Sequence, residues 1–273
     1  MNSTVIEAAA VVAALIFGLR RALSLSKLAA RDGRRAFWSI SALLLAWFLA
    51  ALLLTWLGFY QGSSTRIPTI QYGLLIPIAA GVVLFRRWPV LRRVIESAPQ
   101  EWIVSVQVYR ALGLIFLVLY AGGRLPGAFA LPAGFGDVLV GLLAPIVGIA
   151  VARQWRGSAS LLRAWNWLGI TDLVVAVTTG FLSSPSPFQM LALDRPNELI
   201  SAFPLAMIPV FLVPLSILLH LASLEKLRQT ATASHAAMLT SRETRHGAHS
   251  ISHASAPILR EQPFRPTTVQ PEP

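Results

Sequence analysis

Long apolar runs alternate with short basic or turn-rich segments along most of the chain. Several of these runs reach the roughly 20 residues that an α-helix needs to cross a hydrocarbon core of about 30 Å. Divided at the charged and turn-rich interruptions, the pattern predicts an all-α, polytopic integral membrane helix bundle over residues 1–224 with seven transmembrane helices. In chain order, the predicted spans cover residues 5–19, 37–60, 67–85, 102–121, 128–152, 161–182 and 199–224.

Basic residues are distributed unevenly over the predicted loops. The loops after the first, third and fifth spans hold clusters such as Arg86-Arg87, whereas the loops between them hold the single arginines Arg66, Arg124 and Arg195. Cytoplasmic loops are enriched in Lys and Arg. We therefore expect the N-terminus outside and the C-terminus in the cytoplasm, with Glu7 and Tyr72 solvated near the outer surface.

Two segments outside the spans have a composition of their own. Residues 225–273 are rich in Ala, Ser, Thr, His and Pro, with too few large apolar residues to offset the entropy of ordering, which predicts a disordered cytoplasmic tail. Residues 86–95 mix arginines with apolar side chains. This segment is interpreted as a basic loop whose arginines snorkel, with binding to anionic headgroups as the alternative.

Composition narrows the classes of protein further. The chain is 55% hydrophobic and 13% charged, carries a net charge of +11 and has no cysteine. The positive charge flanks the spans and forms no basic stripe on a soluble module, so no nucleic-acid partner is expected; membrane lipids are. Arginine greatly outnumbers lysine, as in GC-rich bacterial genomes, and the bacterial inner (cytoplasmic) membrane is the predicted location.

No cofactor or metal is expected. The absence of cysteine excludes thiolate metal sites and iron–sulfur clusters. His220 is the only histidine in the predicted spans, which excludes a bis-histidine haem within one chain. His246, His249 and His253 in the tail have ligand-like spacing, but no ordered scaffold is expected to accompany them.

Ionisable residues inside the spans are the main functional signal. A charge at mid-membrane costs about 2.5–3.5 kcal/mol on insertion scales, so it needs a partner, a cavity or a function. Counted at about 1.5 Å per residue, Arg110 lies roughly 12 Å past Trp102, and Asp172 roughly 13 Å past Arg163. Both rise from the cytoplasmic side to a similar depth, which predicts an Arg110–Asp172 ion pair.

Other polar residues gather around this predicted pair. Gln107 lies one turn from Arg110 on the same helix face, while Asn166 and His220 lie near the inner ends of the sixth and seventh spans. Asp137 competes with Asp172 for Arg110 if the fifth helix begins near Pro126, and two carboxylates that share one arginine can take up and release a proton. Taken singly, Gln107, Asn166 and His220 are interpreted as packing residues.

Prolines interrupt several spans, and a short internal similarity accompanies them. The seventh span contains three prolines and must bend or loosen, which suits a gating helix but equally a static kink. Leu75-Ile76-Pro77-Ile78 is similar to Met207-Ile208-Pro209-Val210. This pair would fit a parallel repeat of three spans on either side of the fourth, the plan of small seven-helix sugar transporters.

One motif resembles that of an enzyme family. Gly134-Phe135-Gly136-Asp137 resembles the G-x-G-D signature of intramembrane aspartyl proteases and prepilin peptidases, in which the aspartate is one of a catalytic pair. Those families place the first aspartate on an earlier helix, whereas residues 33–136 contain no aspartate here. The glycines are more simply explained by close helix packing, so an enzyme is the least favoured of the possible functions.

Three functions remain open. The leading hypothesis is a small-molecule transporter or permease-like protein whose substrate or proton pathway uses Arg110 as anion anchor or counter-ion, Asp172 as proton carrier and Asp137 as competing carboxylate, with Gln107, Asn166 and His220 as lining. The alternative is a membrane scaffold or accessory subunit with a membrane-protein partner, whose charges fix helix packing. The third is the aspartyl-protease-like enzyme.

Overall fold

All regular structure in the described part of the chain is helical. The computed structural model describes residues 3–26 and 29–232, and the description below concerns the unit that ends at Arg228. The elements are α1 (Ser3–Leu25), α2 (Ala30–Trp56), α3 (Ile70–Arg87), α4 (Pro89–Ser97), α5 (Gln100–Ser105), the 3-10 helix η1 (Val106–Gly113), α6 (Leu114–Ala121), α7 (Gly127–Ala152), α8 (Ser158–Ser183), the 3-10 turn η2 (Leu199–Ser201) and the π-helical turn η3 (Ile208–Leu212), with which the last helix, Ile208–Thr232, begins.

Six of the helical stretches are long and apolar enough to cross a membrane, as a multi-pass membrane protein requires. They are α1, α2, α3, the continuous stretch α5–η1–α6, α7 and the last helix. Large apolar side chains such as Leu49 and Leu142 are exposed along them, which is expected of surfaces that face lipid. α8 has 26 residues, the same length as α7, but is not among the six because polar residues, including Asn166 and Asp172, interrupt its sequence.

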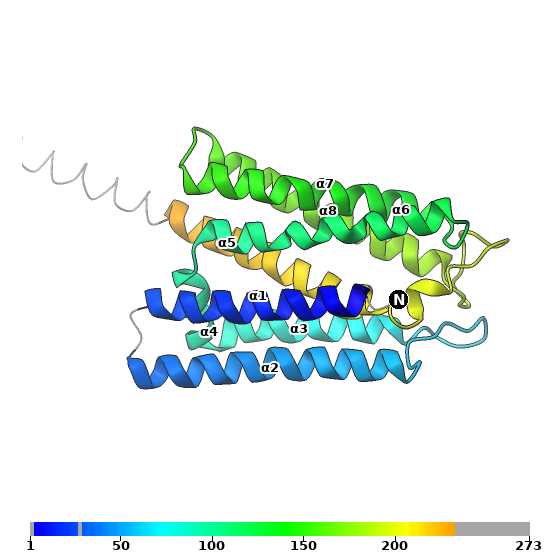
Figure 1. Cartoon of the computed structure of the whole chain (residues 1–273), viewed down its shortest axis with the longest axis horizontal. Helices are drawn as coiled ribbons and strands as arrows, with labels where there is room; N and C mark the ends of the chain where they lie inside the picture. Colours follow the sequence, from blue (N-terminus) through cyan, green and yellow to red (C-terminus); the bar gives the residue numbers. More distant parts are fainter. Residues whose placement is uncertain (1–2, 27–28, 233–273) are drawn as a thin grey trace, which may run out of the picture. The chain divides into compact units, whose positions relative to one another are not determined.

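The last helix lies between two groups of helices and is the most buried of the six. On one side it contacts α1, α2 and α3; Phe211 packs against Trp47 and Phe48 of α2, with ring centroids 4.7 and 5.4 Å apart. On the other side it faces α5–η1–α6, α7 and α8, which pack closely together (Figure 1). Polar side chains of both η1 and α8 reach the last helix from that second group.

Several predicted boundaries differ from the structure. α2 begins at Ala30, and it ends at Trp56 because Gly58 adopts a positive φ of 69°, a conformation that ends a helix. The last helix begins at Ile208 and not at residue 199, since the preceding segment forms η2 and an irregular turn that includes Pro204. It continues to Thr232, eight residues beyond the predicted end, and residues 233–273 of the predicted tail lie outside the described residues.

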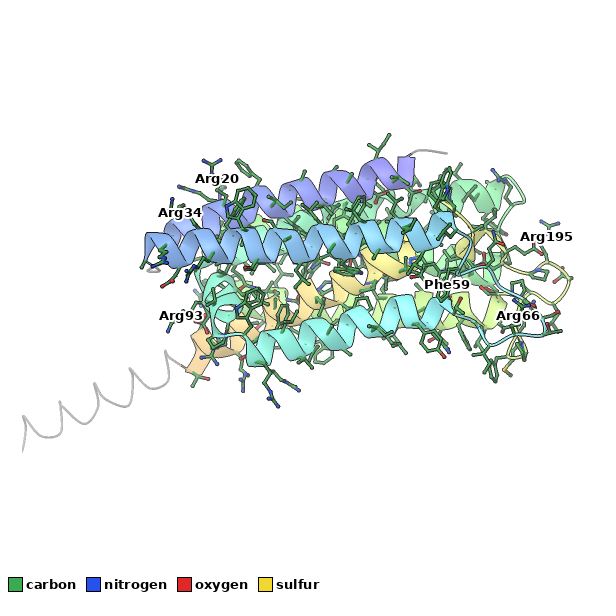
Figure 2. All side chains as sticks on the ribbon, turned by 90° about the horizontal axis from the view of Figure 1, so that it is seen from below. Arg20, Arg34, Phe59, Arg66, Arg93 and Arg195 are labelled. Atoms are coloured by element: carbon green, nitrogen blue, oxygen red, sulfur yellow. The ribbon has the colours of Figure 1, made fainter. Side chains whose placement is uncertain are left out.

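The basic and the arginine-poor loops lie at opposite ends of the unit. Arg20, Arg34 and Arg93 lie at one end, and Arg66 and Arg195 at the other (Figure 2). At the basic end, residues 89–97 of the predicted basic loop form the amphipathic helix α4, with Val94 buried and Arg92 and Arg93 exposed. The ammonium group of Lys226 binds three backbone carbonyls at the end of α4, that of Ala98 at 2.6 Å.

Candidate functional site: a buried arginine shared by two aspartates

Arg110 lies where the fourth membrane-length helical stretch tightens from α-helical to 3-10 geometry. It belongs to η1 and is 3% exposed. Stretches of 3-10 helix longer than three or four residues are uncommon, and one within a longer helix often marks a hinge or strain. Arg110 therefore lies in a segment whose helical geometry differs from that of α5 before it and α6 after it.

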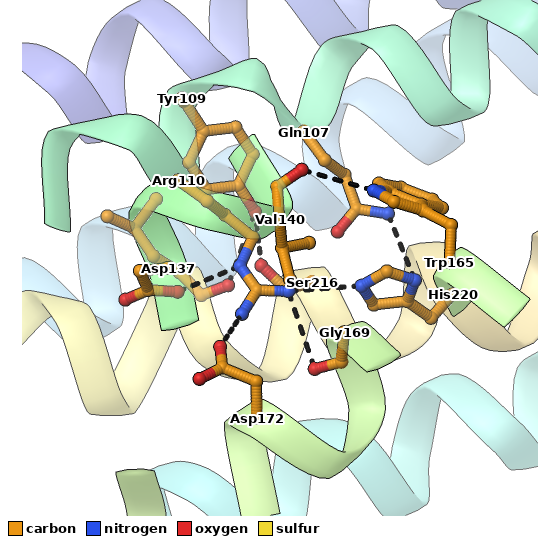
Figure 3. A network of polar contacts seen from close by, with 11 residues as sticks. Gln107, Tyr109, Arg110, Asp137, Val140, Trp165, Gly169, Asp172, Ser216 and His220 are labelled. Carbon is orange, nitrogen blue, oxygen red and sulfur yellow. Dashed lines mark hydrogen bonds and ion pairs between the residues drawn. The ribbon is translucent and has the colours of Figure 1, made fainter. Parts of the chain in front are cut away.

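The guanidinium of Arg110 joins three other helices (Figure 3). Its Nε donates to Oδ1 of Asp137 on α7 at 2.8 Å, and its Nη2 donates to Oδ2 of Asp172 on α8. Its Nη1 donates to the carbonyl oxygen of Gly169 at 3.4 Å and to Nε2 of His220 on the last helix at 3.1 Å. All three nitrogens of the guanidinium are engaged, which leaves little capacity for an additional acceptor.

His220 extends this network toward the basic end of the bundle. Its Nε2 can accept from Arg110 only if unprotonated, so the ring proton lies on Nδ1, which donates to Oδ1 of Asn166 at 2.9 Å. Asn166 Nδ2 in turn donates to Ser223 Oγ at 2.9 Å, and Gln100 Nε2 reaches the same oxygen at 2.7 Å. The chain of hydrogen bonds therefore links η1, α8, the last helix and α5.

Gln107 is the least satisfied member of the network. It is fully buried, and its Nε2 lies 3.5 Å from Nδ1 of His220, although both atoms are donors in the ring tautomer that Arg110 requires. Its Oε1 has no hydrogen-bond partner among the described residues.

Glycines make room for the charged side chains. A Cβ atom at Gly136 would overlap the carboxylate of Asp172, and one at Gly169 would overlap the ring of His220. The glycine of the G-x-G-D motif that precedes Asp137 thus faces the second aspartate across the α7–α8 contact. The close helix packing predicted for these glycines is present at this point.

All six predicted site residues belong to this one cluster. Arg110 pairs with Asp172, and also with Asp137, because α7 begins at Gly127, which places Asp137 well inside the helix. Gln107, Asn166 and His220 form the adjoining polar contacts.

The sequence prediction for Glu7 was wrong. Glu7 is half-buried and, together with Arg110 and Asp137, lines a small pocket of about 20 Å³. α1 packs against η1, which places Glu7 beside Arg110 in the interior of the bundle. Tyr109 was also missed; its hydroxyl lies 2.6 Å from that of Ser216 in the wall of the same pocket.

A larger cavity of about 340 Å³ adjoins the charged cluster. It lies between α3, α7, α8 and η3, and its walls are mainly aliphatic and aromatic side chains. Asp137 contributes to this cavity as well as to the small pocket. The described residues hold no group of three or more His, Cys, Asp or Glu side chains that could bind a metal ion, and the tail histidines lie outside them.

The fold and the buried network define an all-helical, multi-pass membrane protein with a charged core. Residues 67–228, more than half of the chain, match the family described as a domain of unknown function (DUF8737), and the chain belongs to this family. Arg110, Asp137, Asp172 and His220 all lie within the matched region, whereas Glu7 precedes it. No curated protein and no solved structure matches the chain.

Proposed function

We propose that this protein is a small-molecule transporter or permease-like protein of the bacterial inner membrane, with seven spans, the N-terminus outside and the C-terminus in the cytoplasm. The observation that carries the proposal is the position of the Arg110 network, which joins four helices beside a cavity of about 340 Å³. Buried intramembrane charges next to a cavity are typical of substrate and proton pathways.

Departures from α-helical geometry beside the site support a moving element. η1 carries Arg110 in 3-10 geometry, and η3 is a π-helical turn that contains Pro209 and lines the cavity. π-helical turns occur frequently at functional sites, and proline removes a backbone hydrogen bond that would otherwise stiffen the helix. The two segments that could change shape at low cost therefore flank the charged cluster.

Within this proposal, Arg110 acts as a counter-ion and not as an anion anchor. Each of its nitrogens already donates to a protein acceptor, and its side chain is 2% exposed. An incoming anion would have to displace Asp137 or Asp172. The aspartates are the groups that a substrate or proton can address, because their oxygens are acceptors with capacity to spare.

A scaffold or accessory subunit is the second candidate, favoured by a specific observation. Arg110 contacts both carboxylates directly, and the pocket at the guanidinium is only about 20 Å³, too small for a solute. Such a paired contact could serve only to hold helices together. The protease-like reading is weaker, since both aspartates bind the arginine, whereas a catalytic aspartate pair would activate a water.

The topology can be tested in the native background, because the chain has no cysteine. Single cysteines would be placed at Thr65, Ser158 and Gln189, and whole cells treated with a membrane-impermeant maleimide. We expect labelling at Thr65 and Gln189 in intact cells, and at Ser158 only after permeabilisation. Labelling of Ser158 and Gln189 from the same side would show that α8 does not cross, which would refute the seven-span arrangement.

Access to the site distinguishes transport from scaffolding. Ala176→Cys lies in the wall of the larger cavity, and Ser105→Cys lies in α5, toward the basic end from Arg110. A transporter exposes the two positions to opposite sides in different states, so a small cationic thiol reagent should modify Ala176→Cys from outside and Ser105→Cys from inside. A scaffold predicts that neither reacts, while the exposed control Thr65→Cys does.

A further inference from the structure

The larger cavity offers an apolar volume with a carboxylate at its wall. Rings of Phe116, Phe129 and Phe181 and aliphatic side chains of α3 and η3 line it. Such a lining favours a ligand with a hydrocarbon or aromatic body, because it offers few partners for the hydroxyl groups of a sugar or polyol.

Asp137 presents an unused acceptor at this site. The residue is 8% exposed, and its Oδ1 accepts from Arg110 Nε at 2.8 Å. Among the described residues, no donor binds its Oδ2. A carboxylate oxygen at an apolar cavity wall without a protein donor can accept from a ligand, and such a charge-assisted hydrogen bond is stronger there than at a protein surface.

The charged residues at and beside the cavity favour a cationic ligand. Glu7 and Asp137 line the small pocket, and Asp137 also lines the larger cavity. Asp172 lines neither of them but binds Arg110 directly. Arg110 is the only Lys or Arg among the residues that line the two pockets. His220 adds no positive charge when its Nε2 accepts from Arg110. A bound cation would therefore balance the negative charge of these carboxylates whenever more than one of them is ionised.

We propose that the cavity binds a small amphiphilic amine, with its apolar body between α3, α8 and η3 and its ammonium group on Oδ2 of Asp137. This inference rests on the proposed function and names the substrate class of the same site. An anionic amphiphile is disfavoured because Arg110 has no unengaged nitrogen to offer it.

The direct test measures binding of three probes that share one body and differ in the head group. The full chain in lipid nanodiscs would be titrated with radiolabelled 4-phenylbutylamine, 4-phenylbutan-1-ol or 4-phenylbutyrate, and binding to empty nanodiscs subtracted. We expect saturable binding of the amine at least about tenfold tighter than that of the alcohol or the acid. Equal affinities, tighter binding of the acid or no saturable binding would overturn the proposal.

Variants locate the site. Asp137→Asn should abolish the preference for the amine, whereas Asp172→Asn, which removes a carboxylate of the same network outside the cavity wall, should keep it. Ala176→Phe fills the cavity without touching a charge and should weaken all binding at least about tenfold. Unchanged amine binding in Ala176→Phe would place the site elsewhere and refute the inference, whatever Asp137→Asn does to folding.

The outcome is independent of the access experiment. Amine-selective binding without reagent access from two sides would retain the binding site and reject transport. Access from both sides without amine selectivity would retain transport and reject the amine.

Discussion

Among single changes to the charged core, replacing Arg110 by methionine is expected to destabilise the protein most. Methionine keeps an unbranched apolar side chain but removes the guanidinium, which is 2% exposed, from side chains of Asp137 and Asp172 that are 12% and 8% exposed. Two nearly buried carboxylates, a histidine nitrogen and a backbone carbonyl lose their donor together.

The expected cost follows from this loss. Removing one partner of a buried ion pair destabilises soluble proteins by about 3–5 kcal/mol, whereas single hydrogen bonds within membrane proteins average only about 0.6 kcal/mol. Because Arg110 serves two carboxylates at once, we expect Arg110→Met to lower the free energy of unfolding by about 3–5 kcal/mol. The triple variant Arg110→Met/Asp137→Asn/Asp172→Asn leaves no charge behind and should recover most of this loss.

Unfolding would be followed by titration with sodium dodecyl sulfate in mixed micelles. Trp165 reports on the site, because its ring lies 4.8 Å from that of His220. Arg92→Met, which breaks an exposed pair with Glu96, is the matched control and should cost at most about 1 kcal/mol. If Arg110→Met lowers the free energy of unfolding by less than about 1 kcal/mol, or if the triple variant is no more stable than the single one, the carboxylates are hydrated and do not depend on Arg110.

Three smaller changes test neighbouring contacts by the same titration or by hydrogen exchange. Gly136→Ala should destabilise by about 1–3 kcal/mol, since its Cβ would overlap Asp172, whereas Gly18→Ala meets nothing within 4 Å and should be neutral or stabilising; equal effects would contradict the close contact. Tyr109→Phe should cost about 0.5–1.5 kcal/mol through loss of the hydroxyl contact with the last helix, and an unchanged midpoint would count against that bond. Lys226→Met should speed amide exchange selectively in α4, whose terminal carbonyls it binds, and protection equal to that of the wild type would argue that α4 is held by packing alone.

The convergence of the polar residues could be predicted from the sequence. An ionisable group in an apolar span needs a partner, and the depths of Arg110 and Asp172, counted from the cytoplasmic side, are similar. The pairing of Asp137 depended on where α7 begins, and the structure sets this at Gly127. The all-helical fold followed from run length alone, while the crossing of α8, and with it the count of seven, stays a prediction.

What could not be predicted depends on exact helix ends and on side-chain packing. Glu7 was expected to be solvated because it lies near the outer end of the first span, and an apolar run does not reveal that α1 packs against η1 at that position. The cavity arises from side chains of several segments that are far apart in the sequence, so the order of residues along the chain does not predict it. The prolines indicated an irregular last helix, but its π-helical start at Ile208 depends on the neighbours that satisfy the backbone.

The full engagement of Arg110 constrains any mechanism of movement in this protein. A displacement of α7 against α8 separates Arg110 from one of its two aspartates and leaves a carboxylate in apolar surroundings, at a cost comparable to that of breaking a buried ion pair. Such a state is accessible only if that carboxylate takes up a proton or another positive charge replaces the guanidinium. A cation bound at Asp137 would supply that charge, so binding of the ligand and movement of the helices would be coupled through the same carboxylate.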